Sequence, residues 1–499
     1  MQFIRIKKIT EKLFLVLISL ASINLYSQDR QTTVGANTLS LEDVIRIAQT
    51  RSLDWLYAQN FKENTYWAWR TYRSNYLPQL SLSGSLPDFN RAYVPVTQQD
   101  GTTVYRYISN ANSDLTLNVN QSLGLTGGTF FARSLVRRFD NFDSAHQYYY
   151  GGNPFEIGYQ QSIFGYNKLL WDKRIEPLKY EESRKEYVEK VQDISIACTR
   201  HFFNVLLAQI NYQIAQRNTA SNDTTFRITK DRYRLGKVGE NELLQIELSV
   251  MTSRQAQAQA QLDLKTNTQQ LKSYVGIEEN EEIVLTLNDS IPDLEIPEEA
   301  AIEQAKKNAS NAIAFQRRLM EAESDMAQAR SSSGLQADIF ATFGLTNTAS
   351  SVPGMYRDPL NQQALRIGFT VPIVDWGRSQ SRIKTSRANQ ELVKISIAKE
   401  KIVFNQEIKN KVSQFNMLKD QIAVVQWSDK IAAKRYQISK NLYTSGKLDL
   451  TNLNIAMQEK DKAKRDYIQA LRDFWIAYYE IRRLTLYDFE RSTSLVQNN

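Results

Sequence analysis

The stretch of sequence that decides the fold occurs twice, as YRLGKVGENEL over residues 233–243 and as YTSGKLDLTNL over residues 443–453. At an offset of 210 residues the two copies share a tyrosine, a Gly-Lys pair and a final leucine. Glycine ends a helix and lets the chain reverse, because it adopts the left-handed conformation without strain. The sequence therefore predicts two equivalent turns, each joining two helices.

The segments beside these turns lack helix breakers. Residues 378–445 contain neither Gly nor Pro, and the same holds for residues 178–235 and 447–499. Apolar residues between Ile422 and Leu442 recur at helical spacing. A helix of 68 residues would reach about 100 Å, which is typical of a coiled coil, a helical repeat or a helical tube. Several shorter helices interrupted at polar sites are the alternative.

Two blocks, 78–165 and 334–377, hold most of the remaining Gly and Pro, and here the apolar period becomes two. This alternation predicts strands with one apolar face and one small or polar face. The apolar members of the five sets are Leu80, Leu82 and Leu86; Leu115, Leu117 and Val119; Phe155, Ile157, Tyr159 and Ile163; the odd-numbered residues from Leu335 to Leu345; and the odd-numbered residues from Leu365 to Ile373.

An internal repeat links these features. An offset of 257 residues aligns Leu82 with Ile339, and after the β-block an offset of 210 residues aligns Gly158 with Gly368. The 47 residues by which the offsets differ are extra length in the first block, with room for a long loop or for another hairpin over 115–137. Each half therefore reads helix, strands, very long helix, glycine turn, long helix.

The repeat divides the chain into segments that we expect to be structural units. A linker between the halves is indicated by Gly276, Pro292 and Pro297. The expected segments are a signal peptide at 1–27; a first repeat at 28–275, with a helix at 40–76, strands within 78–165 and long helices at 166–275; the linker at 276–297; a second repeat at 298–485, with a helix at 298–333, strands within 335–375 and long helices at 376–485; and a periplasmic tail at 486–499.

The first residues have the pattern of an export signal. Lys7, Lys8 and Lys12 precede an apolar run of 11 residues from Leu13 to Ile23, which is too short to span a bilayer. Cleavage is expected before Gln28. No later stretch approaches the roughly 18 apolar residues of a membrane-spanning helix, so the exported chain is predicted to be either soluble or held in a membrane by β-structure.

Composition argues against several classes of function. The net charge is +8, which is too mild and too dispersed to predict nucleic-acid binding. One cysteine, Cys198, and two distant histidines, His146 and His201, offer almost no ligands for a zinc site and no partners for a nucleophilic dyad. We therefore expect no enzyme, no metal and no cofactor, and we expect Cys198 and His201 to be packing residues. The glycines of residues 124–128 predict a hairpin turn.

The strands pose a problem of closure. The chain offers two clear strands per half, four in all, or six with the extra hairpin. A β-structure in lipid must close on itself, and the smallest bacterial barrels have about 8 strands. Several copies of the chain would have to pool their strands.

At this point the chain resembles the TolC-like outer-membrane factor family over nearly all of its mature length. Residues 39–48 (LSLEDVIRIA) resemble the first helix of that family, and residues 76–80 (YLPQL) resemble the start of its first strand. The turns at 233–238 and 443–448 resemble those at the family's periplasmic tip.

The resemblance implies a mainly α fold with β-structure, in which a homotrimer forms a β-barrel in the outer membrane of a Gram-negative bacterium. Twelve strands would close it if each chain gave four, and a long periplasmic α-helical barrel would continue it. The implied function is a passive duct of a tripartite efflux pump or type I secretion system, exporting small molecules or proteins. The implied partners are outer-membrane lipid, a periplasmic adaptor and, indirectly, an inner-membrane transporter.

The resemblance also assigns roles at the tip. It implies that the adaptor opens the duct by contacting two turns, formed by Leu235, Gly236, Lys237 and Val238 and by Ser445, Gly446, Lys447 and Leu448. In the family an acid six residues after the glycine faces the entrance. Here Glu242 and Asn452 occupy those positions, so a ring would hold three carboxylates rather than six. A solvated glutamate on a helix face is the alternative for Glu242.

One other class of protein would explain the long helices. An exported structural coiled-coil protein without channel activity has the same helical pattern, but it does not explain alternating strands with a consistent apolar parity. Trp376, just after the last strand, is the candidate for an aromatic belt on the periplasmic side of the membrane.

Overall fold

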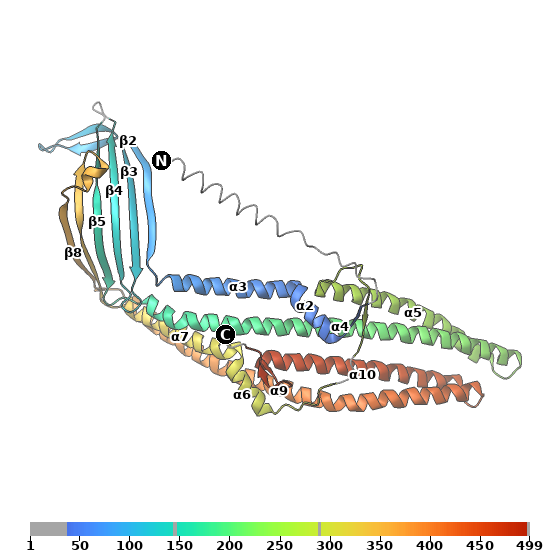
Figure 1. Ribbon diagram of the computed structural model, residues 1–499. Coiled ribbons are helices and arrows are strands. Elements are labelled where there is room, and N and C mark those ends of the chain that lie inside the picture. The colour runs from blue at the N-terminus through green and yellow to red at the C-terminus, as the bar shows by residue number, and fades with distance from the viewer. Residues whose placement is uncertain (1–36, 143–146, 288–290, 497–499) are drawn as a thin grey trace, which may run out of the picture.

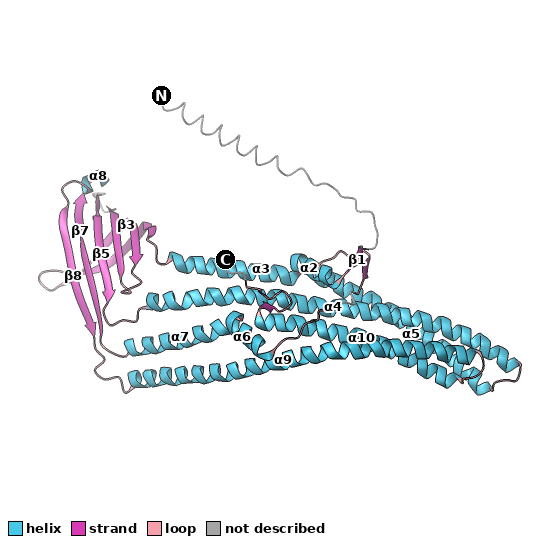
Figure 2. Cartoon of the chain, turned by 60° about the horizontal axis from the view of Figure 1, so that its bottom comes forward, coloured by secondary structure: helices cyan, strands magenta, loops and turns pink. Residues whose placement is uncertain are grey.

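The computed structural model describes residues 37–142, 147–287 and 291–496. A β-sheet stands at one end of the molecule, and long helices run away from it to two turns at the other end (Figures 1 and 2). The predicted signal peptide, residues 1–27, and its cleavage site lie outside the described residues. Within them, no helix combines the length and the apolar character that crossing a membrane requires.

The sheet has six antiparallel strands, so the larger of the two expected strand counts is confirmed. The extra length of the first block forms a hairpin whose turn contains Gly124 and Gly128, as predicted, although its strands extend well beyond 115–137. In spatial order the strands are β2 (Gln79–Thr97), β3 (Thr103–Ser122), β4 (Thr129–Asn141), β5 (Tyr148–Ser162), β7 (Gln336–Ala349) and β8 (Leu360–Thr370), with the short helix α8 (Val352–Met355) between the last two.

The four long helices repeat with identical lengths. Helices α4 (Lys168–Arg234) and α9 (Arg378–Thr444) have 67 residues each. Helices α5 (Glu240–Val275) and α10 (Leu450–Thr485) have 36 residues each. Both pairs are related by the offset of 210 residues seen in the sequence. The very long helices are therefore confirmed, and interruption at polar sites is not observed.

The two helices that precede the strands are each broken once, unlike the single helices expected over 40–76 and 298–333. The first is divided into α2 (Leu41–Arg51) and α3 (Leu53–Ser74), and the second into α6 (Glu298–Asn308) and α7 (Ser310–Ser331).

Both breaks are capped by a side chain at the start of the second helix. Ser52 has an extended backbone, and its hydroxyl accepts a hydrogen bond from the Trp55 amide, so it caps the second helix. Ala309 is also extended but has no capping side chain. The Glu189 carboxylate of α4 instead accepts a hydrogen bond from the Ser310 amide at 3.0 Å. Apolar periodicity continues through such a one-residue break, so the sequence pattern does not mark it.

The linker and the C-terminal residues are attached to the helices. Strand β6 (Ile283–Leu285), within the expected linker, pairs in parallel with β1 (Asn37–Leu39). Strands β9 (Tyr487–Asp488) and β10 (Thr493–Ser494) form a small hairpin within the expected tail. Its Asp488 is buried and lies 3.3 Å from Arg482 of α10.

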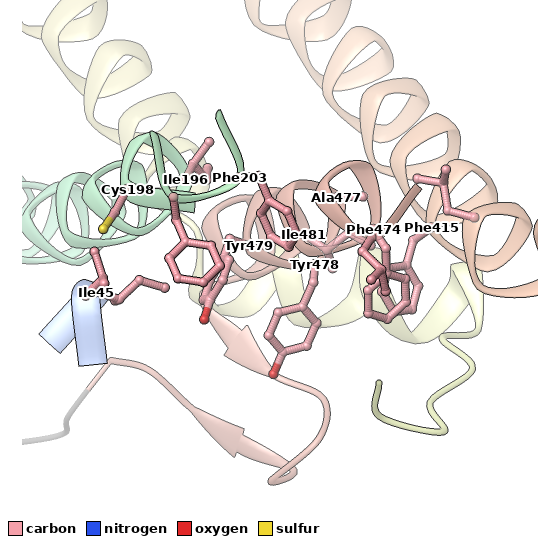
Figure 3. Close-up of a cluster of buried hydrophobic side chains, with 14 of the residues drawn as sticks. Ile45, Ile196, Cys198, Phe203, Phe415, Phe474, Ala477, Tyr478, Tyr479 and Ile481 are labelled. Atoms are coloured by element: carbon pink, nitrogen blue, oxygen red, sulfur yellow. The ribbon is translucent and has the colours of Figure 1, made fainter. Parts of the chain in front are cut away.

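The main hydrophobic core lies midway along the helices, where all four long helices meet α2 and α6 (Figure 3). Phe202, Phe203, Phe415 and Phe474 are fully buried there, and each contributes about 1.5–3 kcal/mol by leaving water. Cys198 is buried in the same cluster, which raises the pKa of its thiol to about 12. The His201 ring stacks on Tyr274 at 4.8 Å. The predicted packing roles of Cys198 and His201 are confirmed.

Candidate functional site

One face of the sheet is largely apolar. The ladder pairs Leu82 with Leu117, Ile157 with Phe343, and Ile339 with Ile367, so apolar residues stand beside apolar residues. The side chains are open to the surroundings, and Leu365 and Phe369 are 71% and 76% exposed. The predicted alternation is confirmed. Such a face is suited to hydrocarbon rather than water.

The opposite face carries the polar residues. Ser83 pairs with Thr116 on it, and Arg133 forms an ion pair of 2.8 Å with the buried Glu156. Phe131 lies over Gly158, where an added Cβ would come within 2.2 Å of the ring. Charged groups and hydroxyls are costly to transfer into lipid, so this face is the one suited to water.

The outer strands of the sheet leave its edges open. Strands β2 and β8 each have a neighbour on one side only among the described residues. Their free N–H and C=O groups would cost several kcal/mol each in a bilayer. The sheet is therefore complete only when other strands cover both edges.

A border of exposed apolar side chains marks the end of the sheet nearest the helices. Leu125, Ile373 and Trp376 are 85%, 91% and 96% exposed. Trp376 lies between β8 and α9, as the belt candidate should. Its place at a membrane interface stays a prediction.

The two turns lie side by side at the end of the molecule farthest from the sheet (Figure 1). Gly236 and Gly446 have φ angles of +67° and +75°, the left-handed conformation that the sequence predicts. Lys237 donates its amide hydrogen to the Arg232 carbonyl, and Lys447 donates to the Leu442 carbonyl, both at 2.9 Å. The backbones of the two turns are therefore equivalent.

The side chains that join the two turns come from outside the predicted set. The Arg232 guanidinium donates hydrogen bonds to the carbonyls of Tyr443 and Thr444, both at 3.0 Å, and lies over the Tyr443 ring. The hydroxyls of Tyr443 and Thr229 are 2.7 Å apart. Sequence reasoning noted Tyr443 as a repeated residue but missed Arg232, because position 442 of the second copy is leucine and the repeat gives no signal.

The positions predicted to line the entrance differ between the copies. Glu242, at the third position of α5, lines a hollow between the turns together with Arg232. Burial raises the pKa of Tyr443 beside it, and the Glu242 carboxylate raises it further. In the second copy the Asn452 amide donates to the Asp449 side chain at 2.8 Å. The acid of this copy is therefore Asp449, the cap of α10, which sequence reasoning also missed.

The described part of the chain contains no cluster of three or more His, Cys, Asp or Glu residues arranged to hold a metal ion. This part of the chain provides a sheet with one apolar and one polar face, and two equivalent turns. About 100 Å of helix separates the turns from the sheet. The coiled-coil alternative accounts for the helices only.

Solved structures share this architecture at low sequence identity. The Campylobacter jejuni CmeC outer membrane channel has a TM-score of 0.64 at 16% identity and covers 89% of this chain and 85% of its own. The Vibrio cholerae outer membrane protein VceC has a TM-score of 0.61 at 13% identity, with 89% and 95% covered. The open state of the Neisseria gonorrhoeae MtrE outer membrane channel has a TM-score of 0.58 at 13% identity, with 89% and 88% covered. At these identities the likeness shows the fold.

Sequence comparison settles the family. No curated protein matches the chain. The sequence model of the family described as "Outer membrane efflux protein" matches residues 122–277 and 301–485, which is well over half of the chain and falls in both repeats. The chain belongs to the outer membrane efflux protein family, and its efflux-channel function and outer-membrane location, with a large periplasmic helical portion, follow from that membership.

Proposed function

We propose that the chain works as a homotrimer whose three sheets close into one barrel. The open edges at β2 and β8 carry this proposal, because lipid cannot satisfy them and another copy of the same sheet can. Three copies of a six-stranded sheet would give eighteen strands, an even number within the bacterial range. This replaces the twelve expected from four strands per chain. At that size a barrel encloses a water-filled channel.

The helices of the trimer would continue the channel through the periplasm. Helices α4 and α9 have 67 residues each and reach about 100 Å. The duct is passive and carries out no catalysis, and a partner pump supplies the energy. Its cargo is small molecules or proteins, in a tripartite efflux pump or a type I secretion system.

The partner at the far end would be a periplasmic adaptor, which in turn meets an inner-membrane transporter. The turns 235–238 and 445–448 suit this contact because they are adjacent and lie at the end farthest from the sheet. Leu235 is 69% exposed, so the first turn offers an apolar contact. Glu242 and Asn452 would line the aperture that the adaptor opens. The Neisseria gonorrhoeae relative is described in an open state, and we propose that this channel opens as well.

Bulky substitutions at the turn glycines test this function. Gly236→Val and Gly446→Val place a β-branched residue at a positive φ and deform the turns. We expect drug efflux to fall strongly in cells that carry either variant. Gly101→Val is the matched control, because Gly101 also has a positive φ, of +83°, with open space around it, but lies in the β2–β3 turn of the sheet.

The readout is intracellular drug accumulation beside the amount of trimer in the outer membrane. Normal efflux in both turn variants at normal trimer abundance would contradict a role of the turns in opening. Equal loss in the Gly101→Val control would show that the defect is general and not specific to the turns.

A further inference from the structure

The polar face of the sheet carries a row of two arginines and two phenylalanines. The Phe131 and Phe340 rings stack with their centres 6.0 Å apart and their planes inclined by 26°. The Arg133 guanidinium lies 5.7 Å from the centre of the Phe131 ring, and the Arg366 guanidinium lies 5.3 Å from the centre of the Phe340 ring. These four side chains run across the face from β4 to β8, and we call them the Arg–Phe row.

A glycine between the two aromatic strands makes the row possible. Strand β5 separates β4 from β7, and its Gly158 pairs with Phe131. The Phe131 ring fills the space above Gly158, where a side chain would stand on any other residue. The ring therefore reaches across β5 to Phe340. The counterpart in the repeat, Gly368, has open space around it, so the filled position belongs to the first copy.

The row lies near the end of the sheet that meets the helices (Figure 1). Phe131 is the third residue of β4, Phe340 is the fifth residue of β7, and Arg366 is the fifth residue from the end of β8. At about 3.3 Å per residue, these side chains stand roughly 7–13 Å inside the sheet. In the proposed trimer the polar face lines the channel, so cargo that leaves the helical portion would first meet three copies of the row.

The two phenylalanines are unusual on a face suited to water. On β2 and β3 the same face carries small polar side chains, such as Ser83, Thr116 and Asn118. The Phe131 and Phe340 rings are only partly covered by the rest of the chain. Apolar rings left partly in water are suited to contact with an apolar or aromatic partner.

The two arginines of the row differ in charge compensation. The buried Glu156 forms an ion pair of 2.8 Å with Arg133. Arg366 takes part in no ion pair with any residue that the structure describes, and its contact is with the Phe340 ring. Asp338, two residues nearer the helices on the same face, is exposed and does not reach it. The row therefore presents the Arg366 charge beside two rings, and a guanidinium binds anionic oxygens in pairs.

We propose that the Arg–Phe row is a binding site for aromatic organic anions on their way through the channel. The ring system of such a cargo stacks on Phe340 or Phe131, and its carboxylate, sulfonate or phosphate group accepts hydrogen bonds from Arg366. The inference rests on the proposed function and names a class of cargo for it. The site is weak, because a duct must release what it binds.

Block of ionic current tests the site. The purified particle is placed in a planar bilayer, and naphthalenesulfonate is added on the side of the sheet, from which it reaches the row without passing the turns. It should reduce the current at a lower concentration than methanesulfonate, which has the charge but no ring. It should also act at a lower concentration than naphthylmethylammonium, which has the ring but the opposite charge.

Substitutions in the row should weaken this block. Arg366→Gln should raise the half-blocking concentration of naphthalenesulfonate by about tenfold, and Phe340→Leu should raise it by roughly fivefold. Arg106→Gln is the matched control for charge, because Arg106 is exposed at the outer end of β3. Phe139→Leu is the matched control for the ring, because Phe139 stacks on Tyr149 on the same face, farther from the helices. Both controls should keep the value of the unmodified channel.

The neighbouring acid should give a change of opposite sign. Asp338→Asn removes a negative charge from the polar face near Arg366, so it should lower the half-blocking concentration by about twofold. Saturation-transfer NMR of naphthalenesulfonate with the detergent-extracted particle measures binding whether or not the turns are open. Its signal should fall in Arg366→Gln and persist in Arg106→Gln.

The outcomes separate this inference from the proposed function. The expected result is a block by naphthalenesulfonate that Arg366→Gln and Phe340→Leu weaken. Equal action of the three ions, or an unchanged block and NMR signal in Arg366→Gln, would overturn the site and leave the channel in place. A particle with the mass of one chain that carries no current would overturn the proposed function itself.

Discussion

The two helical hairpins, α4–α5 and α9–α10, are equal in length and in the hydrogen bonds of their turns, but their side chains differ. Tyr443 is buried and hydrogen-bonded, whereas its counterpart Tyr233 is 41% exposed. Arg232 reaches across to the other turn, and its counterpart is Leu442. The repeat therefore reproduces the backbone, while the side chains distinguish the seam inside the chain from the surface left for another copy.

Removing each tyrosine should show the largest difference in stability between the two turns. Tyr443→Ala leaves a cavity and removes the hydrogen bond between the Tyr443 and Thr229 hydroxyls, so we expect a loss of about 3–5 kcal/mol in local stability. Tyr233→Ala should cost roughly 1–2 kcal/mol, since that ring has no such buried hydrogen bond and loses apolar contact alone. Amide hydrogen exchange at the ends of α4 and α9 measures both. Equal losses would contradict the distinction between the buried and the exposed tyrosine.

Substituting the glycines tests whether the backbones of the two turns are equivalent. Gly236 and Gly446 have nearly the same positive φ, so Gly236→Ala and Gly446→Ala should each destabilise their turn by about 1–2 kcal/mol. Exchange of the Lys237 and Lys447 amides, which bond across the turns, reports the effect. A large loss at one turn only would show that the backbones are not equivalent.

Removing the Arg232 side chain tests a contact that only one of the two repeats makes. Arg232→Gln gives up two hydrogen bonds to the last carbonyls of α9, together with a cation at a helix C-terminus. We expect faster exchange at the second turn and a loss of about 1–2 kcal/mol there. Leu442→Gln, the same change in the second copy, is the control and should leave the first turn unchanged.

Acid should weaken the cap of the second turn, and this effect is the smallest. The Asn452 amide that donates to Asp449 holds the pKa of that carboxyl below its usual value. Its contribution is present above the unfolded-state pKa of about 3.9 and is lost as the pH falls through the lower folded pKa. Gly239, the counterpart, has no side chain to titrate. The protection of the Asn452 amide, expressed relative to the intrinsic exchange rate at each pH, should fall at low pH, and the Asp449→Asn variant should show no such fall.

Much of the architecture could be predicted from the pattern of residues. The absence of Gly and Pro over 378–445 predicted a long helix because these two residues are the strongest helix breakers. The two offsets predicted equivalent helices, and the parity of Leu365, Ile367 and Phe369 predicted the apolar face. These features depend on local periodicity, which the sequence displays directly.

Features that depend on contacts between distant segments could not be predicted. The break at Ala309 is capped by Glu189, which is 120 positions away in the chain. Arg232 bonds to carbonyls of the other repeat, and no periodicity marks it. In both cases a side chain acts on backbone that only the folded layer brings near.

The central claim is that one chain is an incomplete part of a closed tube. Electron microscopy of the detergent-extracted particle tests it most directly, since class averages show both symmetry and length. We predict a tube with threefold symmetry, a sheet-walled end and a helical portion about 100 Å long. A particle holding a single copy of the chain, or one with the edges of β2 and β8 uncovered, would contradict it.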